Sequence, residues 1–477
     1  MKSSDGKLKI LLTKVRESAF APVDIASLVF FRIAFGALLI WHVWSYCALN
    51  RVGRFWLEPR FLFKFCGFSW VHPWSAHWLY IHWVAIGVLA LFVAIGFFYR
   101  ASAALLFLSY TYFFLLDEAQ YVNHTYLICL FSFLFIFVPA HRAFSVDAWL
   151  YPRLRSNTTP AWSLWLLRAQ MGVVYFYGGI AKLTPDWLRG EPMRTRLSHR
   201  TDFPIFGRFL HEEWGVYLVS YGAILLDLFL VPLLLWRRTR IAAFCVAVAF
   251  HLTNARWFEI GIFPWLAIAA TALFLSPSWP RRFVGFFRRV ESAPTPSDWK
   301  LPSARKQFVV LSFVTLYIAI QIIVPLRHFL WSGGIEWRYA EHRFSWRMMM
   351  NRYYTLAYFY VTDPSTGRTL RVNPGQFLNE RQTGLMATLP DYPLQFAHFL
   401  ANVVPRRGPE PIKVEARIFV SLNGRKPELY LDPNVDLAAE PRTLGRPRWL
   451  LSIHEPLPPP NQNYPSANPF ELRSKEN

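Results

Sequence analysis

Charged residues are scarce in this sequence, and acidic residues are the scarcer kind. Asp, Glu, Lys and Arg make up 17% of the 477 residues, whereas an average soluble domain has about 25%. There are 51 Lys and Arg but only 30 Asp and Glu, a formal net charge of +21. This composition excludes intrinsic disorder and a coiled coil. No nucleic-acid partner is expected either, because nucleic-acid-binding domains are rich in charge.

Motifs for metal, disulfide and phosphate chemistry are missing as well. The four cysteines are scattered through apolar sequence and form no C-x-x-C pair, so neither a zinc site nor a disulfide framework is predicted. The patterns GxxxxGK[ST], GxGxxG after a strand, and H-E-x-x-H do not occur. We therefore expect no metal and no phosphate-loop chemistry.

Apolar and aromatic residues are abundant instead, at 54% and 18% of the chain. A helix crosses a bilayer with roughly 17–25 apolar residues. By this measure the sequence predicts an all-α polytopic membrane bundle of about nine transmembrane helices within residues 23–326, after a basic cytoplasmic N-terminus at 1–22. The predicted segments are 25–48, 77–98, 101–117, 123–140, 162–182, 214–236, 239–254, 258–275 and 307–326.

The basic residues predict how this bundle is oriented. If the helices alternate, the loops on the N-terminal side carry 19 Lys and Arg and the loops on the other side carry 10. Cytoplasmic loops carry the excess of basic residues, so the N-terminus is predicted to be cytoplasmic. An odd number of spans then places the chain after about residue 327 on the outer side.

The sequence beyond the last span predicts an extramembrane, β-rich α+β domain over residues 327–455. One β-hairpin is expected from Tyr353–Val361 and Thr369–Val372. Another is expected from Val414–Leu422 and Arg425–Leu431, which flank an Asn-Gly turn. A helix is predicted between them near residues 390–403. Residues 456–477 are rich in Pro, Asn and Ser and are predicted to be disordered.

Polar residues in apolar segments are costly, so each needs an explanation. Three predicted segments bring such residues to the outer membrane face, where they predict a polar site. A structural role stays open for each, because a lysine can extend to the interface and histidines can bond to neighbouring helices. The residues are Asn123 and His124 in the fourth segment, Lys182 in the fifth, and His251 and Asn254 in the seventh.

Three further ionisable residues lie in the apolar part of the chain. Asp227 is in the middle of the sixth segment and must face the bundle interior, and whether its role is structural or functional stays open. Asp24 and Arg32 lie eight residues apart at the inner end of the first segment. We expect them to form a structural pair or to bind other helices.

The sequence around Lys182 resembles a known family. Residues 175–187, YFYGGIAKLTPDW, are similar to the Y-F-x-A-G-x-x-K-L-x-x-D-W segment of vitamin K-dependent γ-glutamyl carboxylases, which have an HTTM-type membrane domain. The resemblance covers about residues 20–450, in order. Other similar segments begin at Asn123, Ser145, Asp227, Phe250, Ile260, Trp279, Phe344, Val420 and Asp432.

This resemblance implies a coupled lyase-type reaction that needs no metal. Vitamin K hydroquinone, or another reduced quinone, is deprotonated and oxygenated by O2, which yields a base strong enough to take a γ-proton from a glutamate side chain. CO2 then adds to the carbanion, and the quinone leaves as its 2,3-epoxide. The implied partners are membrane lipids, a lipid-soluble quinone, and a glutamate-containing peptide or protein.

The resemblance also implies roles for single residues. Lys182 would be the base and His124 would assist the oxygenated intermediate. An ordinary lysine is protonated at neutral pH, so such a base requires a site shielded from water. The other residues expected to bind substrate or quinone are Asn123, Tyr177, His251, Asn254, Trp337, His342 and Trp346.

Some positions depart from the animal members of the family. Ala181 stands where they tend to have a second lysine, and Glu341 and His342 stand where they have neutral residues. The pattern resembles a bacterial relative, so the expected location is a bacterial cytoplasmic membrane. Two alternatives stay open: a quinol epoxidase without peptide carboxylation, and a non-enzymatic carrier or assembly protein that reuses the bundle.

Overall fold

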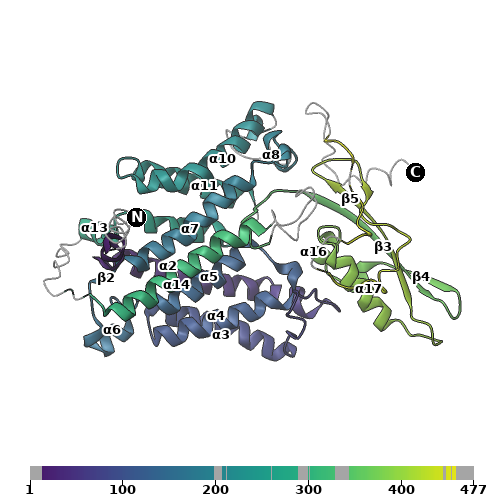
Figure 1. The fold of residues 1–477 in the computed structure, drawn as a ribbon, viewed down its shortest axis with the longest axis horizontal. Coiled ribbons are helices and arrows are strands. Elements are labelled where there is room, and N and C mark those ends of the chain that lie inside the picture. Colours follow the sequence, from purple (N-terminus) through teal and green to yellow (C-terminus); the bar gives the residue numbers. More distant parts are fainter. Residues whose placement is uncertain are drawn as a thin grey trace, which may run out of the picture.

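The protein consists of a long helical bundle with a β-containing C-terminal region at one end (Figure 1). The computed structural model describes residues 13–197, 207–210, 212–258, 260–287, 299, 301–327, 343–443, 447–452 and 454–457. A helix forms at each predicted apolar segment. These helices are α2 (Ala26–Ala48), α3 (Ala76–Ile95), α4 (Tyr99–Leu116), α5 (Asn123–Phe137), α7 (Ala161–Ala181), α10 (Glu213–Leu235), α11 (Arg240–Trp257), α12 (Phe263–Thr271) and α14 (Ala304–Leu326).

Five of these helices, within the described residues, are long and apolar enough to cross a membrane: α2, α3, α4, α10 and α14. The prediction of nine spans is therefore confirmed only in part. Helix α5 has 15 residues and α12 has 9 before a 3-10 turn, η5 (Ala272–Phe274), follows it. Helix α7 is long enough but contains Arg168 and Gln170. That α5, α7, α11 and α12 also cross the membrane stays a prediction.

Short elements connect the long helices. They include a two-stranded antiparallel sheet of β1 (Pro22–Asp24) and β2 (Thr158–Pro160). The others are η1 (Gly53–Leu57), η2 (Glu118–Gln120), α6 (Val146–Leu150), η3 (Pro152–Leu154), α8 (Pro185–Leu188), α9 (Met193–Leu197), η4 (Gly207–Phe209) and α13 (Trp279–Phe287).

The two ionisable residues at the start of α2 bind other segments rather than each other. Asp24 forms an ion pair with Arg281 at 3.0 Å. The fully buried Arg32 donates from Nε to the carbonyl of Ala94 at 3.1 Å and from Nη1 to the carbonyl of Ala140 at 2.7 Å. Arg32 thus satisfies backbone acceptors where two helices end, a common solution for carbonyls without intrahelical partners.

The C-terminal region is built on a four-stranded antiparallel sheet with the order β4-β3-β5-β6. Both predicted hairpins are confirmed, although the return strand of the second is only two residues long. Helix α17 confirms the helix predicted near 390–403, and residues 458–477, predicted to be disordered, lie outside the described residues. The elements are β3 (Tyr353–Asp363), β4 (Arg368–Val372), η8 (Pro374–Gln376), α16 (Glu380–Gly384), α17 (Asp391–Val403), β5 (Lys413–Leu422) and β6 (Glu428–Leu429).

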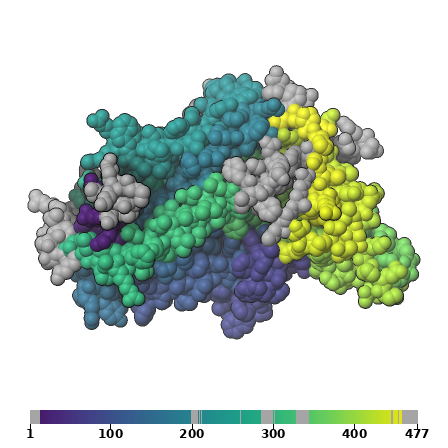
Figure 2. Space-filling model, in the orientation of Figure 1, coloured from purple at the N-terminus to yellow at the C-terminus, as the bar shows by residue number. Residues whose placement is uncertain are grey.

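Apolar and ionic contacts hold this region against the bundle. Phe63 and Ala119, which lie in loops of the bundle, are part of the hydrophobic core of the C-terminal region. Figure 2 shows the same arrangement, with the C-terminal region at the end of the bundle away from the N-terminus. The Arg425 guanidinium donates to both carboxylate oxygens of Asp186 at 2.7 and 2.8 Å, and Asn423 donates to the same carboxylate at 2.8 Å. These three side chains are all buried.

We expect that Arg425→Ala destabilises the protein by about 3–5 kcal/mol, because it leaves the Asp186 carboxylate buried without its charged partner. The matched control is Arg442→Ala, which removes an equally bidentate pair with Asp391 that is only about 70% buried. That change should cost at most about 1 kcal/mol. Thermal unfolding in detergent measures both, and equal losses would contradict the ranking.

Candidate functional site

A cavity of about 260 Å³ lies at the end of the bundle that faces the C-terminal region. Its wall brings together all five polar residues that the sequence analysis placed on one membrane face. Apolar side chains such as Val174, Val219 and Phe250 make up much of the remaining wall. The five polar residues are Asn123, His124, Lys182, His251 and Asn254.

Lys182 ends helix α7 and is 5% exposed. Its Nζ donates to Asp227 Oδ2 at 2.6 Å and to the Gly178 carbonyl oxygen at 2.8 Å. Nζ also lies 5.4 Å from the centre of the Trp187 ring. Asp227, in the middle of α10, is 4% exposed, so the pair is shielded from water on both sides.

Two glycines of α7 allow this pair to form. Helices α7 and α10 lie side by side (Figure 1), and a Cβ on Gly179 would come within 2.7 Å of Leu228 Cδ2 and 3.1 Å of the Leu228 backbone nitrogen. A Cβ on Gly178 would be 3.3 Å from Asp227 Oδ2. Only glycine permits this close approach of the two backbones, as small residues do between membrane helices generally.

His251, on α11, is held by a chain of hydrogen bonds. Its Nε2 lies 2.8 Å from the Tyr175 hydroxyl, which in turn lies 2.7 Å from Thr271 Oγ1. The other ring nitrogen, Nδ1, is buried and has no hydrogen-bond partner among the described residues. The ring is therefore held through Nε2, and its Nδ1 is a buried polar atom that these residues leave without a hydrogen bond.

Asn123 and His124 begin helix α5 on another part of the wall. Asn123 accepts a hydrogen bond from the Tyr121 hydroxyl at 3.2 Å and donates to the Arg347 carbonyl oxygen at 3.3 Å. These bonds tie the start of α5 to the segment that leads into the C-terminal region. His124 lies beside Gly261, whose Cβ, if present, would be 3.8 Å from His124 Nε2.

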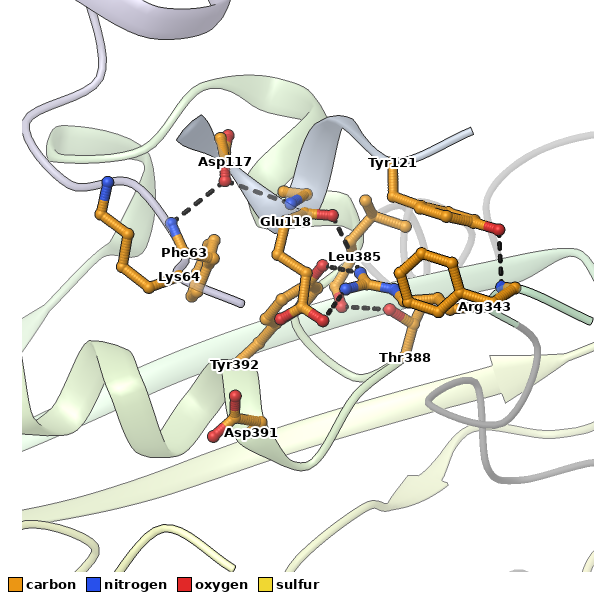
Figure 3. A network of polar contacts seen from close by, with 12 residues as sticks. Phe63, Lys64, Asp117, Glu118, Tyr121, Arg343, Leu385, Thr388, Asp391 and Tyr392 are labelled. Atoms are coloured by element: carbon orange, nitrogen blue, oxygen red, sulfur yellow. Dashed lines mark hydrogen bonds and ion pairs between the residues drawn. The ribbon is translucent and has the colours of Figure 1, made fainter. Parts of the chain in front are cut away.

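Arg343, which lines the cavity, is the centre of a buried network of polar contacts (Figure 3). Arg343 forms an ion pair with Glu118 and donates to the Tyr392 hydroxyl, and its guanidinium lies 5.4 Å from the centre of the Tyr121 ring. Nearby, burial raises the pKa of Asp117 to about 6, although Ala119, Gln120, Phe63 and Gln382 donate hydrogen bonds to it. The network joins the loop after α4 to α17 of the C-terminal region.

The structure separates the remaining predicted site residues from the cavity or does not describe them. The Tyr177 hydroxyl donates to the Ile322 carbonyl oxygen on α14 at 2.7 Å, and Trp346 stacks on Tyr126. Neither residue lines the cavity, and their predicted binding roles stay predictions. Trp337 and His342 lie outside the described residues.

Several cavity residues were not predicted as site residues. Asp227 was noted only as an unexplained charge in an apolar segment. The free-energy cost of placing a charge there was the signal that it needs a partner. Tyr175, Arg343 and Arg347 carried no such signal, because an aromatic residue in a helix and basic residues outside a span are common features of membrane proteins.

Two family models match the chain, the HTTM domain at residues 20–279 and the vitamin K-dependent gamma-carboxylase lumenal domain at residues 306–456. The chain belongs to the vitamin K-dependent gamma-carboxylase family. The first match covers the bundle up to α13, and the second begins within α14 and continues through the C-terminal region. No solved structure gives a significant match. The protein is thus an integral membrane member of a carboxylase family.

We expect that Gly179→Ala disrupts the packing of α7 on α10 and destabilises this carboxylase-family protein by about 1–3 kcal/mol, because the added methyl meets backbone as well as side chain. Gly172→Ala is the matched control on the same helix, where a Cβ would lie 3.8 Å from Val231 Cγ1. The control should be neutral or slightly stabilising, because alanine favours helix. Thermal unfolding measures both, and a neutral Gly179→Ala would contradict the close approach.

Proposed function

We propose that the protein couples the oxygenation of a membrane-soluble hydroquinone to the carboxylation of a glutamate side chain by CO2. The observation that carries this proposal is the buried Lys182–Asp227 pair in the wall of a largely apolar cavity that also contains His124 and His251. Family membership supplies the reaction type. The proposal adds the acceptor, the quinol and the residues that act on them.

The cavity wall is suited to a quinol. Apolar side chains such as Phe250 and Phe263 can contact a ring, and the unpartnered Nδ1 of His251 can bond a ring oxygen. We assign the binding of the ring oxygens to His124, His251 and Asn254. When bound, the hydroquinone supplies, with O2, the strong base that removes the γ-proton of glutamate.

Lys182 is assigned as the base that starts the reaction, by taking a proton from the hydroquinone hydroxyl at Nζ. Its amine must first be free of its own extra proton, and Asp227 Oδ2, 2.6 Å away, can accept that proton. Burial removes the hydration of both charges, so an apolar site permits the form of the pair in which the amine and the carboxyl group are both neutral. Asp227 would therefore set how readily Lys182 acts.

The substrate carboxylate requires a cation at the cavity. Arg343 and Arg347 both line the wall on the side of the C-terminal region. We assign the glutamate carboxylate to Arg347, whose guanidinium can donate two parallel hydrogen bonds. A peptide would then approach along the C-terminal region, while the quinol would enter from the bilayer.

Lys182→Ala and Lys182→Arg should each lower product formation by about 10²–10⁴-fold, the usual contribution of a general base. Arginine keeps a positive charge beside Asp227 but does not give up its proton, so it separates the role of base from the role of ion-pair partner. The assay uses the protein in nanodiscs with a reduced naphthoquinone, O2, labelled bicarbonate and a glutamate-containing peptide. Epoxide and fixed label are measured separately.

The control is Lys426→Ala, which changes an exposed lysine of the C-terminal region and should leave both products unchanged. An active Lys182→Arg variant would overturn the assignment of Lys182 as base. Epoxide without fixed label would favour the quinol epoxidase. Neither product, from protein that is folded and binds quinone, would favour the non-enzymatic carrier or assembly protein.

The proposed orientation places the C-terminal region on the outer side of the membrane. In a variant whose four cysteines are replaced, Arg368→Cys at the start of β4 should react with a membrane-impermeant maleimide in intact cells. Arg237→Cys, in the turn between α10 and α11, should react only after the cells are permeabilised. The reverse pattern would contradict the orientation.

A further inference from the structure

A second cleft lies at the opposite end of the bundle from the Lys182 cavity. Its volume is about 1080 Å³, and it is bordered by the last residue of α5, the first turns of α14 and the segments 139–142 and 154–160. We call it the inner cleft. The Lys182 cavity contains the first residues of α5 and the residue that ends α7, so the two sites are separated by the length of these helices. Nothing in the proposed reaction uses the inner cleft.

The inner cleft is lined by cations without any described carboxylate. Arg100, Arg142, Arg155 and Lys306 are in its wall, and the described lining includes no Asp or Glu. Arg100 donates to the Ile136 carbonyl oxygen at 2.7 Å. The side chains of Arg155 and Lys306 have no hydrogen-bond or ion-pair partner among the described residues, so their charges are available to an anion.

A buried imidazole lies in the same wall as these charges. His141 lines the inner cleft and is only 8% exposed. Its ring stacks on the Tyr99 ring, and the two ring centres are 4.9 Å apart. Its Nδ1 is buried and has no hydrogen-bond partner among the described residues. Burial, reinforced by Arg100, lowers the pKa of His141 to about 4, so the ring is neutral at pH 7. A neutral imidazole can donate one N–H to an anionic oxygen.

Part of the remaining wall of the inner cleft is apolar, and this part continues onto the outer face of α14. Phe137 and Phe313 lie with their ring centres 4.4 Å apart, and Val310 borders the same cleft. Val309, also in the wall, is 58% exposed on a helix that is long and apolar enough to cross the membrane. In Figure 2 this helix lies across one face of the bundle. A ligand in the cleft therefore meets cations at one end and lipid-facing apolar surface at the other.

From this combination we propose that the inner cleft binds an anionic phospholipid, with the phosphate at Arg142, Arg155 and Lys306 and an acyl chain along Val310 and Phe313. A soluble anion would use the cations but not the apolar wall, and a zwitterionic lipid would gain less from four cations whose described surroundings in the cleft include no carboxylate. Basic pockets between membrane helices on the cytoplasmic side are typical sites for anionic headgroups. The predicted cytoplasmic position of this end of the bundle agrees with that location.

The test measures lipid retention by the full-length protein in detergent, by native mass spectrometry with dioleoylphosphatidylglycerol or dioleoylphosphatidylcholine. Arg155→Gln/Lys306→Gln should weaken binding of the anionic lipid by about 30-fold, because each basic residue near an anionic headgroup contributes about a fivefold factor. Binding of the zwitterionic lipid should not change. The matched control is Arg237→Gln/Arg238→Gln, which removes two exposed cations on the same predicted side outside the cleft.

Val310→Trp supplies an independent variant, because it fills the apolar wall and leaves every charge in place. It should lower retention of the anionic lipid without changing thermal unfolding in lipid-free detergent. The proposal is overturned if the control variant loses as much binding as the cleft variant, or if both lipids bind wild type equally. It is also overturned if Val310→Trp has no effect, or if inorganic phosphate displaces the lipid at equal concentration, because the occupant would then be a soluble anion.

Discussion

The close approach of α7 and α10 is the constraint on which the candidate site depends. A lysine and a carboxylate are placed in an apolar bundle only if each satisfies the other, because an isolated buried charge costs several kcal/mol. The glycines that precede Lys182 remove the side chains that would keep the helices apart. Tyr175, on the same helix α7, is within hydrogen-bonding distance of His251 on α11. Helix α7 thus makes the contacts that hold both the amine and an imidazole of the cavity.

Much of the helical architecture could be predicted because apolar runs of this length have few alternatives to a helix. The hairpins of the C-terminal region were predictable for a similar reason, since β-branched and aromatic residues flank clear turn residues. The short lengths of α5 and α12 were harder to foresee, because hydropathy does not show where a helix ends inside an apolar run. The second hairpin was predicted too long for a related reason, since Arg425 is bound to Asp186 rather than paired in a strand.

The candidate site was predictable to the extent that polar residues in apolar segments are costly. That argument found five of the polar residues of the cavity wall and drew attention to Asp227, but it did not predict that Asp227 pairs with Lys182, 45 residues earlier in the chain. Helix geometry explains the difference between the two tyrosines of α7. The side chains of residues two apart in sequence are rotated by about 200° about the helix axis, so they lie on nearly opposite faces of the helix. Tyr175 therefore faces the cavity while Tyr177 faces α14.

The shared core at the end of the bundle has a consequence for how this chain can change over evolution. Phe63 and Ala119 from the helical part complete the core of the C-terminal region, and Asp186, four residues beyond Lys182, satisfies a buried arginine of that region. The C-terminal region is therefore not an interchangeable module, because a version taken from another protein would leave apolar surface and a buried carboxylate unmatched. Variation at this contact must instead proceed by paired substitutions on both sides of it, within four residues of the lysine in the cavity wall.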